Sequence, residues 1–226
     1  MARDRRIVAA KAVVWVLCLT PAARLAADAA GGRLGPNPVE EVLLRTGWWT
    51  LVLLLASLAV TPLRRLTGRV RLIRFRRLLG LFAFGYATMH FLGYVVLDQW
   101  FAWEFIVEDI AKRPFILVGF TAWCLLLPLA VTSTRGWIRR LGRGWGLLHR
   151  LVYVAACLGA LHFYWKVKAD TREPLVFAAI LGVLLLARLP VVRQSLGRAR
   201  RGGGTAGRRD AHAAGRTDEI ASAPGS

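Results

Sequence analysis

The chain has 226 residues, of which 56% are hydrophobic, and its 32 lysines and arginines against 13 acidic residues give a net charge of +19. The basic residues lie in short clusters between long apolar runs, as in an integral membrane protein whose orientation is set by its arginines. A nucleic-acid-binding domain would carry them along a soluble face, so we expect a multi-pass protein in contact with membrane lipid, without nucleic acid as a partner.

Six apolar segments predict six membrane-spanning helices. They cover approximately residues 7–23, 47–63, 78–97, 114–132, 146–165 and 175–189. The first resembles the apolar part of a signal peptide, but it is long for one and further spans follow, so an uncleaved span is preferred. The third has twenty residues, which correspond to roughly 30 Å of helix and suffice to cross a bilayer.

The connecting loops set the expected orientation. Residues 64–77 contain seven arginines and residues 133–145 contain four, with no acid in either loop, whereas residues 98–113 contain four acids. By the positive-inside rule both termini are cytoplasmic. Residues 1–190 are therefore predicted to be an all-α bundle of six transmembrane helices, with its core at about 45–190. Residues 191–226, rich in glycine, alanine and arginine, are predicted to be a disordered basic tail.

Three histidines lie inside predicted spans, where an ionisable residue is costly and typically functional. His90 in the third span and His162 in the fifth are expected at similar depths in the outer half of the membrane. Two imidazoles facing each other across a helix bundle suit the axial positions of one b-type haem. The alternatives are hydrogen bonds to neighbouring helices and zinc, for which no Cys, Asp or Glu lies at that depth.

His149 leaves the number of haems open, at one or two. It lies 13 residues before His162, about 20 Å along a helix, and therefore near the inner end of the fifth span. An inner partner for it on the third span would fall at Arg76 or Arg77, and neither is an expected haem ligand.

Four further residues are candidates for binding a cofactor. Arg76 and Arg77 lie at the cytoplasmic end of the span that carries His90, where a haem propionate, a flavin phosphate or a quinone headgroup would be met. Tyr86 and Tyr94 lie four residues before and after His90. They are predicted to contact the edge of the cofactor ring or its propionates.

Seven short motifs, taken together and in order, resemble the MsrQ family, which is also called YedZ. They are Thr-Pro-Leu-Arg-Arg at 61–65, Arg-Arg-Leu-Leu-Gly-Leu at 76–81, Tyr-Ala-Thr-Met-His at 86–90, Lys-Arg-Pro-Phe-Ile-Leu-Val-Gly at 112–119, Leu-Pro-Leu-Ala-Val-Thr-Ser at 127–133, Trp-Gly-Leu-Leu-His-Arg-Leu-Val-Tyr at 145–153 and Leu-His-Phe at 161–163. The resemblance covers about residues 45–190.

The resemblance implies a ferric-reductase-like haem-binding core in the bacterial inner membrane. Family members bind b-type haem through histidines that match His90, His149 and His162, and FMN is associated with them. They pass electrons from the quinone pool or a cytoplasmic flavin reductase to MsrP, a periplasmic molybdopterin-containing subunit that reduces methionine sulfoxide in envelope proteins. The chain is then expected to be an electron-transfer subunit without a catalytic domain of its own, since no nucleotide-binding glycine motif follows a strand.

Two other functions stay open at this point. The chain could be the haem subunit of another membrane oxidoreductase, similar to a ferric reductase, an NADPH oxidase or a dehydrogenase cytochrome b. It could also be a non-redox scaffold or transporter, although the paired half-helices and buried acid–base pairs of a transporter are not evident. Haem content separates the redox functions from the last one.

Overall fold

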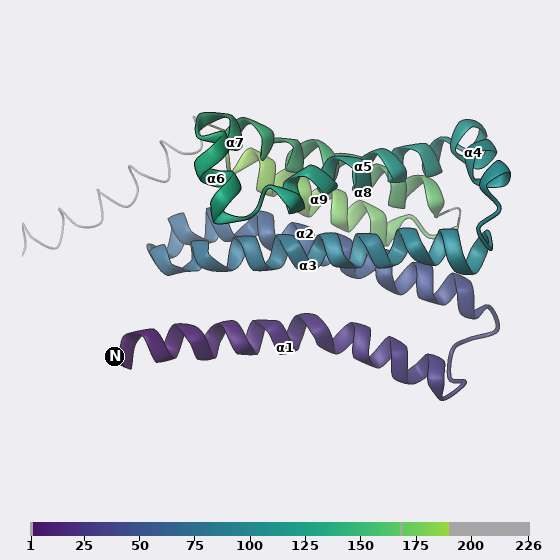
Figure 1. Ribbon diagram of the computed structural model, residues 1–226, viewed down its shortest axis with the longest axis horizontal. Helices are drawn as coiled ribbons and strands as arrows, with labels where there is room; N and C mark the ends of the chain where they lie inside the picture. Colours follow the sequence, from purple (N-terminus) through teal and green to yellow (C-terminus); the bar gives the residue numbers. More distant parts are fainter. Residues whose placement is uncertain (1, 168, 190–226) are drawn as a thin grey trace, which may run out of the picture. The chain divides into compact units, whose positions relative to one another are not determined.

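The computed structural model describes residues 2–167 and 169–189, and the regular structure within these ranges is helical (Figure 1). Within these ranges, five segments are long and apolar enough to cross a membrane: Ile7–Ala30, Pro38–Thr67, Val70–Asp98, Pro114–Val131 and Arg143–Lys166. The helices are α1 (Ala2–Ala30), α2 (Pro38–Thr67), α3 (Ile73–Gly93), α4 (Trp103–Lys112), α5 (Pro114–Val131), α6 (Arg135–Leu141), α7 (Arg143–Leu148), α8 (Leu151–Lys166) and α9 (Arg172–Leu186).

The predicted spans differ from the helices in two places. The predicted fifth span, 146–165, is not one continuous helix, because α7 ends at Leu148 and α8 begins at Leu151. The predicted sixth span, 175–189, corresponds to α9, whose 15 residues give about 22 Å of helix against about 30 Å of bilayer core. Six spans therefore stay a prediction, and the predicted tail at 191–226 lies outside the described residues.

Local signals explain where α2 begins and ends. The Asn37 side chain accepts a hydrogen bond from the backbone N–H of Glu40, and Pro38 occupies the first turn, where its missing N–H costs nothing. The helix ends at Gly68, whose φ of 69° is the left-handed conformation that glycine adopts without strain.

Two helix pairs dominate the packing of the compact unit that extends to Leu184. α2 packs along α3, α5 packs along α8, and α3 also contacts α5 (Figure 1). The contacts bury small residues, including Ala83 and Ala87 on α3 and Ala155 and Ala156 on α8. Small side chains let helix backbones approach closely in a bilayer, so the sequence favours tight pairs at these positions. We call them the α2–α3 pair and the α5–α8 pair.

Helix α1 is attached to α3 through a few side chains. The rings of Trp15 and Phe82 meet edge to face at 4.8 Å between centroids. The Tyr86 hydroxyl donates to the carbonyl of Cys18 at 2.7 Å and accepts from the N–H of Ala22 at 3.0 Å. Cys18 and Ala22 are four residues apart and therefore form one step of the backbone hydrogen-bond ladder of α1, so the hydroxyl of Tyr86 bonds to both groups of that step, next to Pro21.

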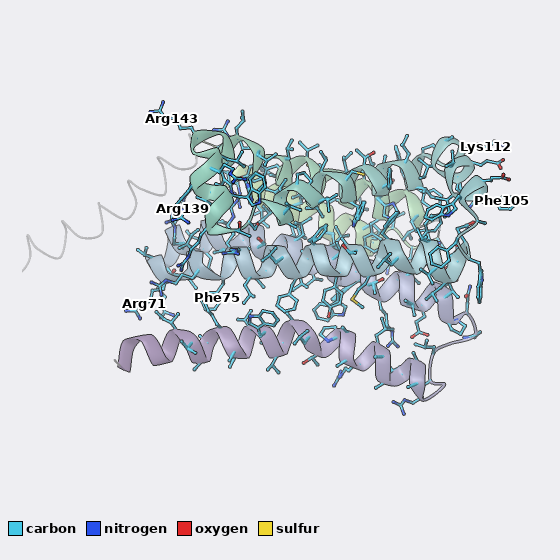
Figure 2. All side chains as sticks on the ribbon, viewed as in Figure 1. Arg71, Phe75, Phe105, Lys112, Arg139 and Arg143 are labelled. Carbon is cyan, nitrogen blue, oxygen red and sulfur yellow. The ribbon has the colours of Figure 1, made fainter. Side chains whose placement is uncertain are left out.

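The two arginine-rich loops lie at one end of the bundle. Figure 2 shows Arg71, Arg139 and Arg143 at one end of the helices and Phe105 and Lys112 at the other. This arrangement agrees with the prediction that loops 64–77 and 133–145 lie on one side of the membrane and 98–113 on the other.

Candidate functional site

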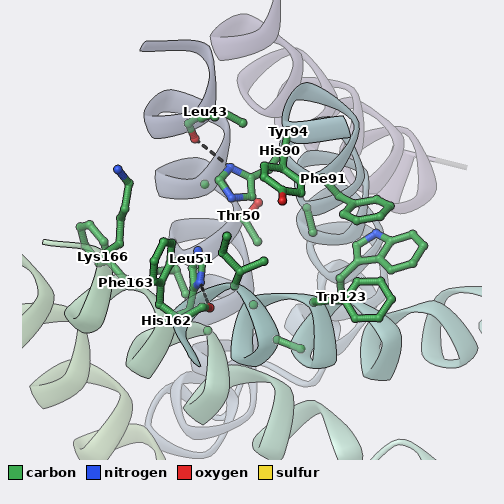
Figure 3. Close-up of a pocket in the computed structure, with 18 of the residues that line it drawn as sticks. Leu43, Thr50, Leu51, His90, Phe91, Tyr94, Trp123, His162, Phe163 and Lys166 are labelled. Carbon is green, nitrogen blue, oxygen red and sulfur yellow. Dashed lines mark hydrogen bonds between the residues drawn. The ribbon is translucent and has the colours of Figure 1, made fainter. Parts of the chain in front are cut away.

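His90 of α3 and His162 of α8 lie opposite each other between the two helix pairs (Figure 3). Their ring centroids are 6.0 Å apart, and the ring planes are inclined at 81°. The sequence placed both residues at similar depth, and the structure brings them into direct proximity. Two bonds of about 2 Å each would set imidazole nitrogens about 4 Å apart on opposite sides of one metal ion. Ring centres lie further back than the nitrogens, so the observed separation suits such a pair.

Each histidine is held by a backbone carbonyl of the neighbouring helix. Nδ1 of His90 lies 2.8 Å from the carbonyl oxygen of Leu43 on α2, and Nδ1 of His162 lies 2.6 Å from the carbonyl oxygen of Phe115 on α5. A carbonyl only accepts, so the neutral imidazoles carry their proton on Nδ1. The Nε2 lone pair of each ring is then available for a metal, as in many metal sites where the second ring nitrogen donates to a carbonyl.

The two histidines line a cavity of about 440 Å³. This volume falls within the range of about 300–1,000 Å³ that is usual for sites of small molecules and cofactors. The walls are largely apolar and aromatic, with Phe91 and Trp123 stacked at 4.5 Å between ring centroids. Four charged side chains also line the cavity: Glu40, Asp98, Arg113 and Lys166. A flat, hydrophobic molecule with a charged edge would match this combination of walls and charges.

The charged lining residues are held in a network that includes Tyr94. The Tyr94 hydroxyl donates to Asp109 at 3.1 Å, and Nε of Arg113 lies 3.1 Å from the other carboxylate oxygen of Asp109. On the opposite side, Nζ of Lys166 lies 3.7 Å from Glu40. Tyr94 is thus a lining residue of the cavity, as a cofactor contact would require.

The other three predicted cofactor residues, Tyr86, Arg76 and Arg77, lie away from this cavity. Tyr86 is buried against α1, and its hydroxyl is used in the bridge between Cys18 and Ala22. Arg76 and Arg77 lie in the first turns of α3 and do not line the cavity.

 Arg76 precedes His90 by 14 residues, which is about 21 Å of helix, so the two arginines belong to the opposite end of α3. Their binding role stays a prediction about that end of the molecule.

His149 forms a separate site at the junction of α7 and α8. Its ring stacks on Trp145 at 4.0 Å between centroids, and its Nδ1 lies 3.2 Å from the carbonyl oxygen of Trp145. Its Nε2 is buried and has no hydrogen-bond partner in the described part of the chain. A buried nitrogen without a partner is costly, and it fits a ligand that binds at this position. His149 does not line the cavity of His90 and His162.

Sequence reasoning missed the groups that hold the two histidines. The acceptors are main-chain carbonyls of Leu43 and Phe115, and a carbonyl has no residue-specific signature. The cations Arg113 and Lys166 were not singled out either, because both lie at helix ends, where basic residues ordinarily flank a membrane span. A signal for them existed in part, since Lys166 ends α8, which carries His162, and Arg113 immediately precedes α5, the partner of α8.

A comparison with protein families gives the class first. The family described as ferric reductase like transmembrane component matches residues 46–160, which include the α2–α3 pair, α5 and most of α8. The structure and this match define an all-helical, multi-pass membrane protein with a ferric-reductase-like core.

Comparison with individual proteins narrows the class to one family. The chain is 52% identical over 185 residues to the protein-methionine-sulfoxide reductase heme-binding subunit MsrQ of Xanthomonas axonopodis pv. citri, covering 79% of this chain and 85% of the relative. It is 55% identical over 183 residues to the MsrQ protein of Rhodospirillum rubrum, covering 80% and 88%. The chain therefore belongs to the MsrQ family, as its motifs predicted. No solved structure matches it.

Proposed function

We propose that this chain is a membrane cytochrome b subunit that holds a b-type haem between His90 and His162. The observation that carries the proposal is the pair of imidazoles at 6.0 Å, each with Nδ1 on a carbonyl, which leaves Nε2 as the nitrogen that can bind a metal. The related proteins are named as heme-binding subunits, and the apolar cavity with a charged rim suits a porphyrin with its two propionates. Haem would supply one-electron chemistry, with its potential set by ligation and burial.

The chain's own residues would have three tasks around this group. His90 and His162 would fix the iron from two separate helix pairs. The aromatic walls, including Phe91 and Trp123, would exclude water. The cations Arg113 and Lys166 would be the nearest partners for propionates, since guanidinium and ammonium groups pair well with carboxylates. Tyr94 would support this rim through Asp109.

The electron path would run through the chain from a donor to a separate acceptor. We expect the acceptor to be a periplasmic molybdopterin subunit of the MsrP kind, because the relatives are named as subunits of a protein-methionine-sulfoxide reductase. The donor would be the quinone pool or a cytoplasmic flavin reductase. The acidic connection 98–113 and residues 166–174 are the candidate docking segments at the end that bears the cavity. Six spans with both termini in the cytoplasm of a bacterial inner membrane complete this proposal.

The end of the bundle near His149 would receive electrons from the donor. The buried Nε2 of His149 is a free ligand for a second haem, which would bring the number to two. Arg76 and Arg77 are proposed to meet the phosphate of FMN or a quinone headgroup at the same end. The FMN proposal rests on the resemblance to the family alone.

Haem content tests the proposal. We would purify the protein in detergent, record oxidised and reduced spectra, and count haem per chain by pyridine haemochrome. The expected result is a low-spin b-type spectrum with at least one haem per chain, which His90→Ala and His162→Ala each abolish for the cavity haem. No haem after expression with adequate haem supply would contradict the proposal and favour a non-redox scaffold. A different soluble partner that co-purifies would favour another membrane oxidoreductase.

A further inference from the structure

The same arrangement of three groups occurs twice in this chain. In the α2–α3 pair, the Leu43 carbonyl accepts from His90, and in the α5–α8 pair, the Phe115 carbonyl accepts from His162; each acceptor precedes its histidine by 47 residues. A glycine lies four residues after each acceptor, at Gly47 and Gly119. The glycine therefore precedes the histidine by 43 residues in both pairs.

Each glycine is in contact with the histidine ring. A Cβ on Gly47 would lie 3.1 Å from both Nδ1 and Cε1 of His90, and a Cβ on Gly119 would lie 2.6 Å from Nδ1 of His162. The second distance is shorter than real Cβ contacts, so the ring of His162 would have to move. Any other residue type at Gly119 would occupy the space in which Nδ1 reaches the carbonyl.

The position of the glycine has a simple physical reason. In an α-helix the carbonyl of one residue accepts from the N–H four residues later, so the carbonyls of Leu43 and Phe115 already bond within their helices. A carbonyl has a second lone pair, but the side chain at the fourth following residue normally stands beside it. Glycine at that position leaves the second lone pair accessible to a side chain from the neighbouring helix.

We propose that Gly47 and Gly119 are positioning residues of the haem site, which open the carbonyls of Leu43 and Phe115 to the two ligand histidines. The carbonyl then fixes Nδ1 as the protonated nitrogen and keeps Nε2 directed into the cavity. It also fixes the rotation of each ring, and hence the angle of 81° between the ring planes. This inference rests on the proposed function, because it assigns a role to the glycines only if the histidines bind a metal.

The test uses the full chain in detergent as wild type, Gly47→Ala, Gly119→Ala and the control Gly85→Ala. Gly85 lies on α3, five residues before His90, and a Cβ there meets no atom within 4 Å. Haemin is titrated into haem-free protein, and the ferric spectrum is recorded by electron paramagnetic resonance. Nearly perpendicular imidazole planes give a spectrum dominated by one strongly shifted low-field feature, whereas planes closer to parallel give three resolved lines.

We expect weaker haem binding in both variants, with a larger effect for Gly119→Ala because its Cβ contact is the shorter one. Loss of a partner of a metal-binding histidine typically weakens binding about 10–100-fold. At saturation the low-field feature should move toward the three-line pattern in the variants and stay unchanged in Gly85→Ala. A merely structural role would lower the maximal haem content without changing either the binding constant or the spectrum of the haem that remains.

Three outcomes would overturn the inference. Wild-type binding and spectrum in both glycine variants would refute the positioning role while leaving the proposed haem site intact. Equal loss of affinity in Gly85→Ala would refute it too, since a Cβ at Gly85 meets no other helix among the described residues. No haem binding by the wild type would overturn the proposed function together with this inference. If Gly119→Ala does not fold, the milder Gly47→Ala decides, and wild-type behaviour there would refute the role.

Discussion

Replacement of Tyr86 by phenylalanine tests how α1 is attached to the bundle. The variant keeps the buried ring but removes the hydroxyl that bridges Cys18 and Ala22 at 2.7 and 3.0 Å. Each hydrogen bond contributes about 0.5–1.5 kcal/mol net in proteins and about 0.6 kcal/mol on average inside membranes. The two together should stabilise the docked position of α1 by about 1–2 kcal/mol. Haem content should stay unchanged, because Tyr86 does not line the cavity.

The exposure of Cys18 gives the assay. This thiol is buried, with 4% of its surface exposed, whereas Cys124 and Cys157 are exposed. In a background with Cys124→Ser and Cys157→Ser, Cys18 should react with a maleimide only when α1 opens. A loss of 1–2 kcal/mol raises the open population about 5–30-fold, and the labelling rate should rise by that factor.

Tyr164→Phe serves as the matched control, because Tyr164 is 43% exposed and its hydroxyl is not part of the α1 contact. An unchanged labelling rate in Tyr86→Phe would refute the bridge as the attachment of α1. It would mean that the N–H of Ala22 and the carbonyl of Cys18 bond directly once the hydroxyl is gone. Loss of haem in Tyr86→Phe would instead support the cofactor contact that the sequence predicted for this residue.

Three further predictions concern the two ends of the bundle. His149→Ala should leave the spectrum of the cavity haem unchanged, because His149 lies outside the cavity. Loss of that spectrum would mean that His149 and the cavity histidines belong to the same site. Arg76→Ala should slow reduction by a cytoplasmic donor more than it lowers haem content, and unchanged stopped-flow kinetics would count against its role. Asp109→Ala should release Tyr94 and Arg113 and so speed tryptic cleavage at the neighbouring bond after Lys112, and an unchanged cleavage rate would contradict the proposed rim network.

Much of the helical architecture was predictable from apolar length alone. Segments such as 78–97 and 114–132 are too long and too apolar for anything but a membrane span, and five candidate spans are confirmed. The interruption of the fifth predicted span was not predictable, because His149 and Arg150 are compatible with a helix and the turn there depends on packing. α9 has the predicted length but begins and ends three residues earlier, since the apolar composition of 175–189 says nothing about where helical bonding starts or ends.

The facing of His90 and His162 was predictable from the sequence, but their surroundings were not. His90 and His162 stood out because ionisable residues are rare in spans, and their depth followed from counting residues. Tyr86 lies one turn from His90 and only about 40° around the helix from it, yet its hydroxyl bonds to α1, a contact that the sequence spacing does not reveal. The roles of Gly47 and Gly119 depend on which helices pair, and a single sequence does not reveal that. Their equal spacing from the two histidines becomes informative only with the pairs in view.

Replacement of His162 by methionine tests whether His90 and His162 hold one haem between them. His162→Met keeps a side chain that can bind haem iron, and a Met/His pair raises the reduction potential relative to two histidines. If His90 and His162 hold one haem, potentiometric titration of the variant should give a more positive midpoint potential for the cavity haem. The variant should bind haem as tightly as the wild type or more weakly. A cavity haem with the wild-type potential and spectrum in this variant would contradict the account, because His162 would then not be a ligand.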